Sequence, residues 1–440
     1  MAADVVLKEL SAACASARSA GADDAVAGVA PRYAASPASV EEASALLRAA
    51  AAHDLAVVPK GSGSKLAWGA APARCDLVVD TLGMTGVLEH AAGDLVARVQ
   101  AGVPLTRLAE VLAAAGQQLA VDVPAGPGGA PAGTAGGLLA TAVAGPRRLR
   151  YGTPRDLVIG ITVVRADGTV ARSGGKVVKN VAGYDLGKLF AGSYGTLGLI
   201  AEAVFRLHPL PAASAFVSAS FGDAATARQA VATAAASDAS PAAVEINRPG
   251  RGGPVEVAAL FEGEPAALGQ RCETVSRALG RGAVSEQPPG WWGQAAAVPA
   301  GPAGTGTLIR IGFWAAALPG VLAAVDRAGE DAGVDPAVGG SAAAGVLYVR
   351  LAADSEAGAV AAFVSALRAE LGREGARSPA AAADITPPAV ASAVVLHAPP
   401  GVRGQLDLWG PVPSLSLMRA VKDQFDPAHR MAPGRFAGGI

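Results

Sequence analysis

The feature that most constrains this chain is a loop rich in glycine and serine, residues 59–64 (PKGSGS), which directly follows the apolar run at residues 55–58. Glycine has no Cβ, so the backbone can turn tightly there and bring its amide groups close to a ligand. The two serines add hydroxyl donors, and Lys60 and Lys65 add positive charge. The pattern predicts a buried strand that ends in a phosphate-binding turn.

The spacing of this loop excludes the two common phosphate loops. A dinucleotide fingerprint that starts at Gly61 needs a glycine at its sixth position, but Leu66 stands there. A P-loop needs Ser or Thr after Gly-Lys, whereas the two Gly-Lys pairs of this chain precede Val177 and Leu189. Taken alone, the loop leaves two interpretations open: a nucleotide site of another kind, or a solvent-exposed turn.

Two later glycine segments favour the nucleotide interpretation. Residues 133–141 (GTAGGLLAT) supply amide donors and hydroxyls that could open a helix, and a helix N-terminus attracts anions. Residues 192–200 (GSYGTLGLI) run into an apolar strand that we expect to end near Leu207. Because single glycine loops are common but three joined to apolar elements are not, we infer a long ligand with a diphosphate and a flat apolar ring system.

Composition narrows the class of protein. A chain of 440 residues is long enough for two or three domains, and a net charge of -1 gives no general attraction to nucleic acid. Its three cysteines, Cys14, Cys75 and Cys272, lie too far apart to form a local iron–sulfur or zinc signature. Glycine and proline interrupt the long uncharged stretches, and no signal peptide is visible. We therefore expect a cytoplasmic protein that meets the inner face of the membrane, if at all, through partners.

The chain divides into four predicted segments. Residues 1–28 form a helical lead, residues 29–211 alternate strands and helices, residues 212–410 form a second domain, and residues 411–440 form a helical tail. In the second domain, two β-α-β sets without glycine motifs predict two ferredoxin-like halves on one sheet, so the fold class is α+β. The expected strands are 216–221, 243–246, 255–261, 307–313 and 345–351, and the expected helices are 224–236, 321–329 and 357–371.

The order of these motifs resembles one known family. The three glycine segments, the motif Tyr151-Gly-x-x-Arg-Asp156 and the pair Asp167-Gly168 occur as in the PCMH-type, two-subdomain FAD-binding domain of the vanillyl-alcohol oxidase superfamily, over about residues 30–211. Within that superfamily, residues 144–148 (AGPRR) and 179–186 (KNVAGYDL) look like the FAD-binding subunit of glycolate oxidase. The closing segment 433–435 (PGR) fits the tail of FAD-linked oxidases, but Ala432 stands where the family usually has Asn.

The resemblance implies three groups of FAD-binding residues. The pyrophosphate would be held by Lys60, Gly61, Ser62, Gly63, Ser64 and Lys65. Along the flavin and its ribityl chain would lie Thr134, Gly136, Gly137 and Thr141. The adenosine half or the ring would be contacted through the backbone of Gly195, Thr196, Gly198 and Ile200. No histidine or cysteine lies between Pro59 and Gly69, where some members attach the flavin covalently, so we expect non-covalent FAD.

Catalytic residues cannot be assigned from the sequence, and we expect no metal site. None of the five histidines (His53, His90, His208, His397 and His429) belongs to the close histidine pair with a carboxylate that holds the metal in related 2-hydroxyacid dehydrogenases. Five residues of the FAD-binding domain keep two interpretations each. Tyr151, Tyr184 and Tyr194 either line the flavin or pack as core. Asp156 either serves the site or caps a turn, and Ile200 either serves the site or packs as core.

Three functions follow from the resemblance. The first is an FAD-dependent oxidoreductase subunit that oxidises glycolate to glyoxylate and passes electrons through the flavin to a larger FAD-linked subunit and an iron–sulfur subunit. The second is a stand-alone FAD dehydrogenase for another small 2-hydroxy acid, such as D-lactate, which would need a base and a carboxylate clamp from Arg310, Arg350 or His397. The third is a non-catalytic scaffold of the same complex. The sequence does not identify the 2-hydroxy acid.

Overall fold

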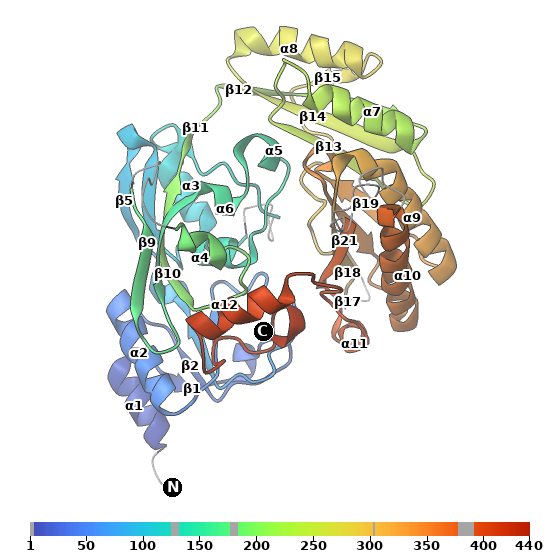
Figure 1. The fold of residues 1–440 in the computed structure, drawn as a ribbon. Helices are drawn as coiled ribbons and strands as arrows, with labels where there is room; N and C mark the ends of the chain where they lie inside the picture. Colours follow the sequence, from blue (N-terminus) through green and yellow to red (C-terminus); the bar gives the residue numbers. More distant parts are fainter. Residues whose placement is uncertain (1–3, 125–131, 177–183, 302–303, 377–390) are drawn as a thin grey trace.

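The computed structural model describes residues 4–124, 132–176, 184–301, 304–376 and 391–440. Figure 1 shows two lobes and a carboxyl-terminal tail between them. We call the part that holds the first two large sheets the amino-terminal lobe, and the part built on the eight-stranded sheet the cap lobe. Among the described residues, no helix combines the length and apolar character needed to cross a membrane.

The first sheet of the amino-terminal lobe has four strands and carries the glycine loop at one edge. Its order is β1 (Arg18–Ser19), β2 (Tyr33–Ala35), β4 (Leu77–Asp80) and β3 (Val57–Lys60), with β4 parallel to both β2 and β3. Helices α1 (Val5–Ala13) and α2 (Val40–Ala52) pack against it through one apolar core. Ser39 caps α2: its side chain accepts a hydrogen bond from the amide of Glu42 at 3.1 Å.

The second sheet of this lobe has five antiparallel strands and supports the other two glycine segments. Helices α3 (Leu105–Ala113) and α4 (Ala135–Thr141) pack against this sheet in a second core, and the short helices α5 (Arg148–Tyr151) and α6 (Pro154–Leu157) come directly before strand β8 in the chain. The order of its strands is β5 (Val87–Ala91), β6 (Val96–Gln100), β10 (Leu199–Arg206), β8 (Val158–Val164) and β9 (Val170–Gly174).

The cap lobe confirms the prediction of two ferredoxin-like halves. Each half has the chain order β-α-β-β-α-β, and in each half the fourth strand lies beside the first and the third between the first and second. The first half consists of β12 (Ala213–Phe221), α7 (Ala224–Ala235), β13 (Ala243–Arg248), β14 (Val255–Gly263), α8 (Pro265–Ala278) and β15 (Ala283–Ser285). The second consists of β18 (Thr307–Phe313), α9 (Leu318–Ala332), β19 (Ala337–Gly340), β20 (Val346–Leu351), α10 (Ala357–Ala376) and β21 (Ala391–His397).

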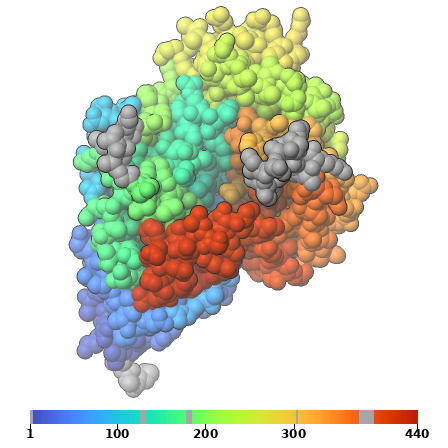
Figure 2. Space-filling view, viewed as in Figure 1, coloured from blue at the N-terminus to red at the C-terminus, as the bar shows by residue number. Residues whose placement is uncertain are grey.

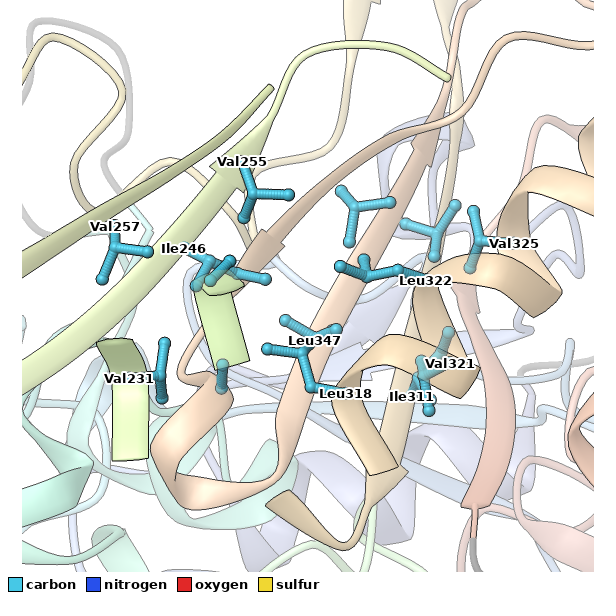
Figure 3. Close-up of a cluster of buried hydrophobic side chains, with 14 of the residues drawn as sticks. Val231, Ile246, Val255, Val257, Ile311, Leu318, Val321, Leu322, Val325 and Leu347 are labelled. Carbon is cyan, nitrogen blue, oxygen red and sulfur yellow. The ribbon is translucent and has the colours of Figure 1, made fainter. Parts of the chain in front are cut away.

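The two halves join edge to edge into one sheet of eight strands. Strand β13 pairs with β19 in antiparallel register, with Ile246 opposite Gly340 and Arg248 opposite Val338. One face of this sheet packs on the helices: Figure 3 shows Ile246, Ile311 and Leu347 of the strands directed toward residues of α7 and α9. Because side chains alternate along a strand, the residues between them, such as Glu245, face away from these helices.

The carboxyl-terminal tail packs between the two lobes. It contains α11 (Pro400–Arg403) and α12 (Leu415–Phe425), and in the space-filling view its residues fill the surface between the lobes (Figure 2). Beyond α12 the chain extends the first sheet, because the amide of Val57 donates to the carbonyl of Arg430 and the amide of Ala432 donates to the carbonyl of Val57, both at 2.8 Å. Ala432 has a φ of 42°, a conformation in which Asn is more common than Ala.

Candidate functional site

The glycine loop after β3 forms one wall of a cavity in the amino-terminal lobe. Gly63 has a φ of +76°, which a residue with a Cβ rarely adopts, and this positive φ makes the tight turn. Gly61 lies against Thr134, so closely that a Cβ at this position would be 2.4 Å from the Thr134 Oγ1 atom. Glycine at residue 61 is therefore what lets the loop and the start of α4 share one cavity.

The second glycine segment opens α4 as predicted. Thr134 is the N-cap, and its side chain accepts a hydrogen bond from the amide of Gly137 at 3.2 Å. Thr141 closes the helix by donating its hydroxyl to the carbonyl of Gly137 at 2.8 Å. Gly136 packs on Ala101, which a Cβ would approach to 2.8 Å, so α4 lies directly on the five-stranded sheet.

The third glycine segment forms a turn that lines the first cavity and a second cavity next to it. Gly195 has a φ of +78° and packs against Pro59, to which a Cβ would come within 3.2 Å. It lines both the first cavity and a second, adjoining cavity formed with Gly198 and Ile200. Tyr194 precedes it with a φ of 55° and lines the first cavity.

Thirteen of the fourteen predicted FAD-binding residues line these two adjoining cavities. The first cavity is lined by Lys60, Gly61, Ser62, Gly63, Ser64, Lys65, Thr134, Gly137, Thr141 and Gly195, and the second also by Gly136, Gly198 and Ile200. The exception is Thr196, which is buried away from both. Its hydroxyl donates to the carbonyl of Ser193 at 2.7 Å, and its own carbonyl accepts a hydrogen bond from Lys422 at 2.7 Å. Thr196 therefore binds Lys422 of the carboxyl-terminal tail and does not line either cavity.

Three cationic side chains reach the first cavity. Lys60 lies 3.7 Å from Asp80, and Lys65 contacts the hydroxyl of Ser64 at 3.4 Å and the carbonyl of Ala132 at 3.3 Å. Burial lowers the pKa of Lys65. The third is Arg435 of the tail, which our sequence analysis did not place in the site. Its only sequence signal is the Pro-Gly-Arg motif, since nothing in the order of the chain brings residue 435 near residue 60.

A larger cavity of about 600 Å³ lies between the lobes and is a second part of the candidate site. Asp122 and Arg147 line it from the amino-terminal lobe, and Glu245, Ser341 and Tyr348 line it from the cap lobe. The Ser341 hydroxyl donates to the Glu245 carboxyl. Glu245 is 2% exposed, and this burial raises its pKa to about 8. A volume of this size suits a small organic ligand.

The residues suggested for a base and a carboxylate clamp are not brought together at this cavity. Arg350 donates to the carbonyl of Gln294 at 3.2 Å, and His397 bonds the carbonyl of Gly306 at 3.0 Å through Nδ1. His397 lines a different cavity of about 750 Å³ near the tail. Arg310, Arg350 and His397 are all absent from the described lining of the interlobe cavity.

The structure places the residues that had two interpretations in different surroundings. Tyr194 lines the first cavity, whereas Tyr151 donates its hydroxyl to Glu262 of the cap lobe at 2.8 Å and Tyr184 is exposed. Asp156 caps α6, accepting hydrogen bonds from the amide and the hydroxyl of Thr153 at 2.8 and 2.7 Å. Residues 179–183 of the predicted glycolate oxidase motif lie outside the described residues. In the described ranges, no group of three His, Cys, Asp or Glu residues could hold a metal ion.

The lining of the first cavity fits a ligand that carries a diphosphate. Glycine backbones at residues 61, 63, 137 and 195 let amide groups approach the ligand, and the three nearby cations are complementary to phosphate. Arg435 lines this cavity, and one of its terminal nitrogens is buried without a hydrogen-bond partner, which is uncommon for a buried donor. Apolar side chains of Leu66, Leu105 and Val143 complete the wall.

Comparisons with known proteins agree with this geometry. The family described as an FAD-binding domain matches residues 31–174. Glycolate oxidase subunit GlcD of Bacillus subtilis is 36% identical over 210 residues, which cover 48% of this chain and 44% of that protein. D-lactate dehydrogenase of Archaeoglobus fulgidus is 40% identical over 173 residues (39% and 38%), and glycolate oxidase subunit GlcE of Escherichia coli is 40% identical over 129 residues (29% and 36%).

The chain spans less than half the length of each of these relatives. Over the whole chain, the fold is that of p-cresol methylhydroxylase, whose substrate-bound structure superimposes with a TM-score of 0.71 at 16% identity, covering 98% of this chain and 96% of that one. The predicted PCMH-type fold and FAD as cofactor are thereby confirmed.

Proposed function

Because residues 31–174 form an FAD-binding domain and the whole chain has the fold of p-cresol methylhydroxylase, we propose that this FAD-dependent oxidoreductase is the FAD-binding subunit of a multi-subunit glycolate oxidase. The complex oxidises glycolate to glyoxylate and passes the electrons through the flavin to partner subunits. The partners are a larger FAD-linked subunit and an iron–sulfur subunit. A cytoplasmic location, at the inner face of the membrane through these partners, belongs to the same proposal.

The observation that carries the proposal is the pair of adjoining cavities built from three glycine segments. The loop at residues 59–65 would hold the pyrophosphate, and α4 with Gly195 would flank the rest of the cofactor. Relatives named as two different glycolate oxidase subunits, GlcD and GlcE, support the complex. The three cysteines of the sequence lie far apart, so an iron–sulfur centre on a partner subunit would complement this chain.

FAD, when bound, supplies the two-electron oxidation of the alcohol. The residues of this protein have two other roles. Glycine backbone groups and lysines orient the cofactor in the amino-terminal lobe, and the interlobe cavity holds a proton on the Glu245 carboxyl, which is neutral at pH 7 because burial raises its pKa to about 8. The cap sheet supplies one wall of this cavity through Glu245 and Tyr348.

A second candidate is a stand-alone FAD dehydrogenase for another 2-hydroxy acid. The interlobe cavity favours it, because this chain itself provides a space of about 600 Å³ with a buried carboxyl in its wall. The relative named as a D-lactate dehydrogenase also supports it.

One preparation separates these possibilities. We would purify the chain alone, record its flavin spectrum, release the flavin with acid to test for non-covalent attachment, and assay glycolate and D-lactate with an artificial electron acceptor. The subunit proposal expects a yellow protein with little turnover alone and strong glycolate turnover after co-expression with its partners. Robust turnover by the isolated chain would favour the stand-alone dehydrogenase, and a colourless protein that binds no added FAD would favour a scaffold.

A further inference from the structure

The carboxyl-terminal tail brings a buried positive charge into the cavity beside the glycine loop. Arg435 is 3% exposed and lines the first cavity together with Lys60 and Gly61. Its Nη2 atom donates to the carbonyls of Leu66 and Trp68, at 2.9 Å each. Its Nη1 atom is buried and has no hydrogen-bond partner. One edge of the guanidinium is therefore fixed by the turn after the loop, and a donor on the other edge is free.

Arg435 differs in its charge environment from the equally buried Arg248. Arg248 pairs with Asp326 of α9, at 2.8 to 2.9 Å. In the described parts of the chain, Arg435 forms no ion pair with a carboxylate. Burial lowers the pKa of Arg435 to about 10, which still leaves the guanidinium charged at neutral pH. A buried charge without a counter-charge is unfavourable, so this residue is set to gain from an anionic ligand group.

We propose that Arg435 binds an anionic oxygen of the FAD on which the proposed function depends, so that the tail forms a third wall of the cofactor site. Two parts of FAD carry such an oxygen: the diphosphate, and the pyrimidine edge of the flavin ring, which becomes anionic on reduction. Both offer an acceptor for a charged N–H donor, which makes a hydrogen bond stronger than one between neutral groups.

The tail is held firmly enough to position this residue. Lys422 of α12 is completely buried and donates to Asp426 at 2.6 Å, to the carbonyl of Thr196 at 2.7 Å and to the carbonyl of Met431 at 2.9 Å. The segment that follows pairs with Val57, next to the glycine loop. Binding of FAD by Arg435 would therefore couple occupancy of the site to docking of the tail.

The test compares three variants for FAD affinity, measured by the quenching of FAD fluorescence on titration with the full-length apoprotein. Arg435→Met removes the charge but keeps the length of the side chain, and Arg435→Lys restores the charge. Arg430→Met is the matched control, because Arg430 is in the same tail but bonds the carbonyls of Ala51 and Ala166, away from the cavity. We expect Arg435→Met to weaken FAD binding by about 10- to 100-fold, Arg435→Lys by less, and Arg430→Met by under about 3-fold.

Two further measurements distinguish the two oxygens. If Arg435 binds the diphosphate, Arg435→Met lowers the affinity for the competitor ADP by the same factor as the affinity for FAD. If Arg435 meets the ring, ADP competes unchanged and the reduction potential of the bound flavin falls. Equal effects of Arg435→Met and Arg430→Met, or FAD affinity and potential unchanged in Arg435→Met, would overturn the inference. Failure of the wild-type protein to bind FAD would overturn the proposed function instead.

Discussion

The contact between Gly61 and Thr134 makes the strongest single-residue prediction about the cofactor site. A Cβ at residue 61 would lie 2.4 Å from the Thr134 Oγ1 atom, so the threonine would have to turn away and lose its cap on α4. For Gly61→Ala we expect a loss of about 1 to 2 kcal/mol in the free energy of unfolding, and FAD binding at least about 10-fold weaker. Gly93→Ala is the control, because Gly93 has open space around its Cβ position.

Urea unfolding and FAD titration of both variants would check this prediction. Near-equal FAD affinity of Gly61→Ala and the wild-type protein would show that the loop and α4 do not grip the cofactor together.

Glu245 predicts a dependence of stability on pH. Its pKa is about 8 in the folded protein against an ordinary value of 4.5, so the folded state binds more protons than the unfolded state between these values. The contribution of Glu245 to stability is complete below about pH 4.5 and is lost as the pH rises toward 8. With Glu245→Gln, the fall in the free energy of unfolding over this window should become shallower, by up to about 1.4 kcal/mol per pH unit.

The measurement is a set of urea unfolding curves at several values between pH 5 and pH 8. Glu41→Gln, on the exposed face of α2, is the control and should follow the wild-type slope. Identical slopes for Glu245→Gln and the wild-type protein would contradict the expected protonation of Glu245.

At the scale of elements, Lys422 should fix α12 to the amino-terminal lobe, because it pairs with Asp426 of the tail and donates to the carbonyl of Thr196. Replacing Lys422 by Met leaves Asp426, which is completely buried, without its counter-charge. We expect Lys422→Met to lower the free energy of unfolding by about 3 to 5 kcal/mol and to weaken FAD binding through the displaced tail. Asp423→Asn on the same helix removes only an exposed pair with His429, so it should cost less than about 1 kcal/mol.

Chemical unfolding and limited proteolysis of the tail would check this pair of variants. If Lys422→Met behaved like Asp423→Asn, the tail would have to be held by its other contacts.

The elements themselves were largely predictable because their signals are local. The strand predicted at residues 307–313 is β18 with those same bounds, and the predicted helix 224–236 ends one residue earlier. Ser39 and Thr134 cap their helices through the side-chain chemistry that the sequence displays. The local sequence pattern is enough to predict a helix or strand whose position depends only on its own residues.

The site was less predictable where it depends on distant contacts. Thr196 looked like its glycine neighbours, but its carbonyl binds Lys422, 226 residues later in the sequence. Arg435 and Glu245 reach cavities only through the folded positions of the tail and the cap sheet. No periodicity or motif spacing reports such contacts, and the roles of the thirteen cavity-lining residues in binding FAD stay predictions.

At the scale of the whole molecule, a polar contact across the interface should stabilise the packing of the two lobes against each other. Tyr151 and Arg147 of the amino-terminal lobe both reach Glu262 on β14, at 2.8 and 3.5 Å, and Glu262 is buried. Tyr151→Phe removes one hydrogen bond to a buried charge, which should cost about 1 to 3 kcal/mol. Tyr184→Phe is the control, since Tyr184 is 90% exposed.

Thermal unfolding and the rate of proteolysis between the lobes would measure the effect. Unchanged values for Tyr151→Phe would mean that the lobes are held together by the tail and apolar contacts alone.

The pairing of β13 with β19 also has a consequence for the synthesis of the protein. Residues 213–285 form the first half of the cap sheet, but the strand that covers the edge of β13 is made only at residues 337–340. Until then the nascent chain carries an open edge with free amide and carbonyl groups, the feature that drives edge-to-edge aggregation. Truncation before residue 337 should therefore yield insoluble protein, whereas truncation within the tail should yield a soluble protein that binds FAD poorly.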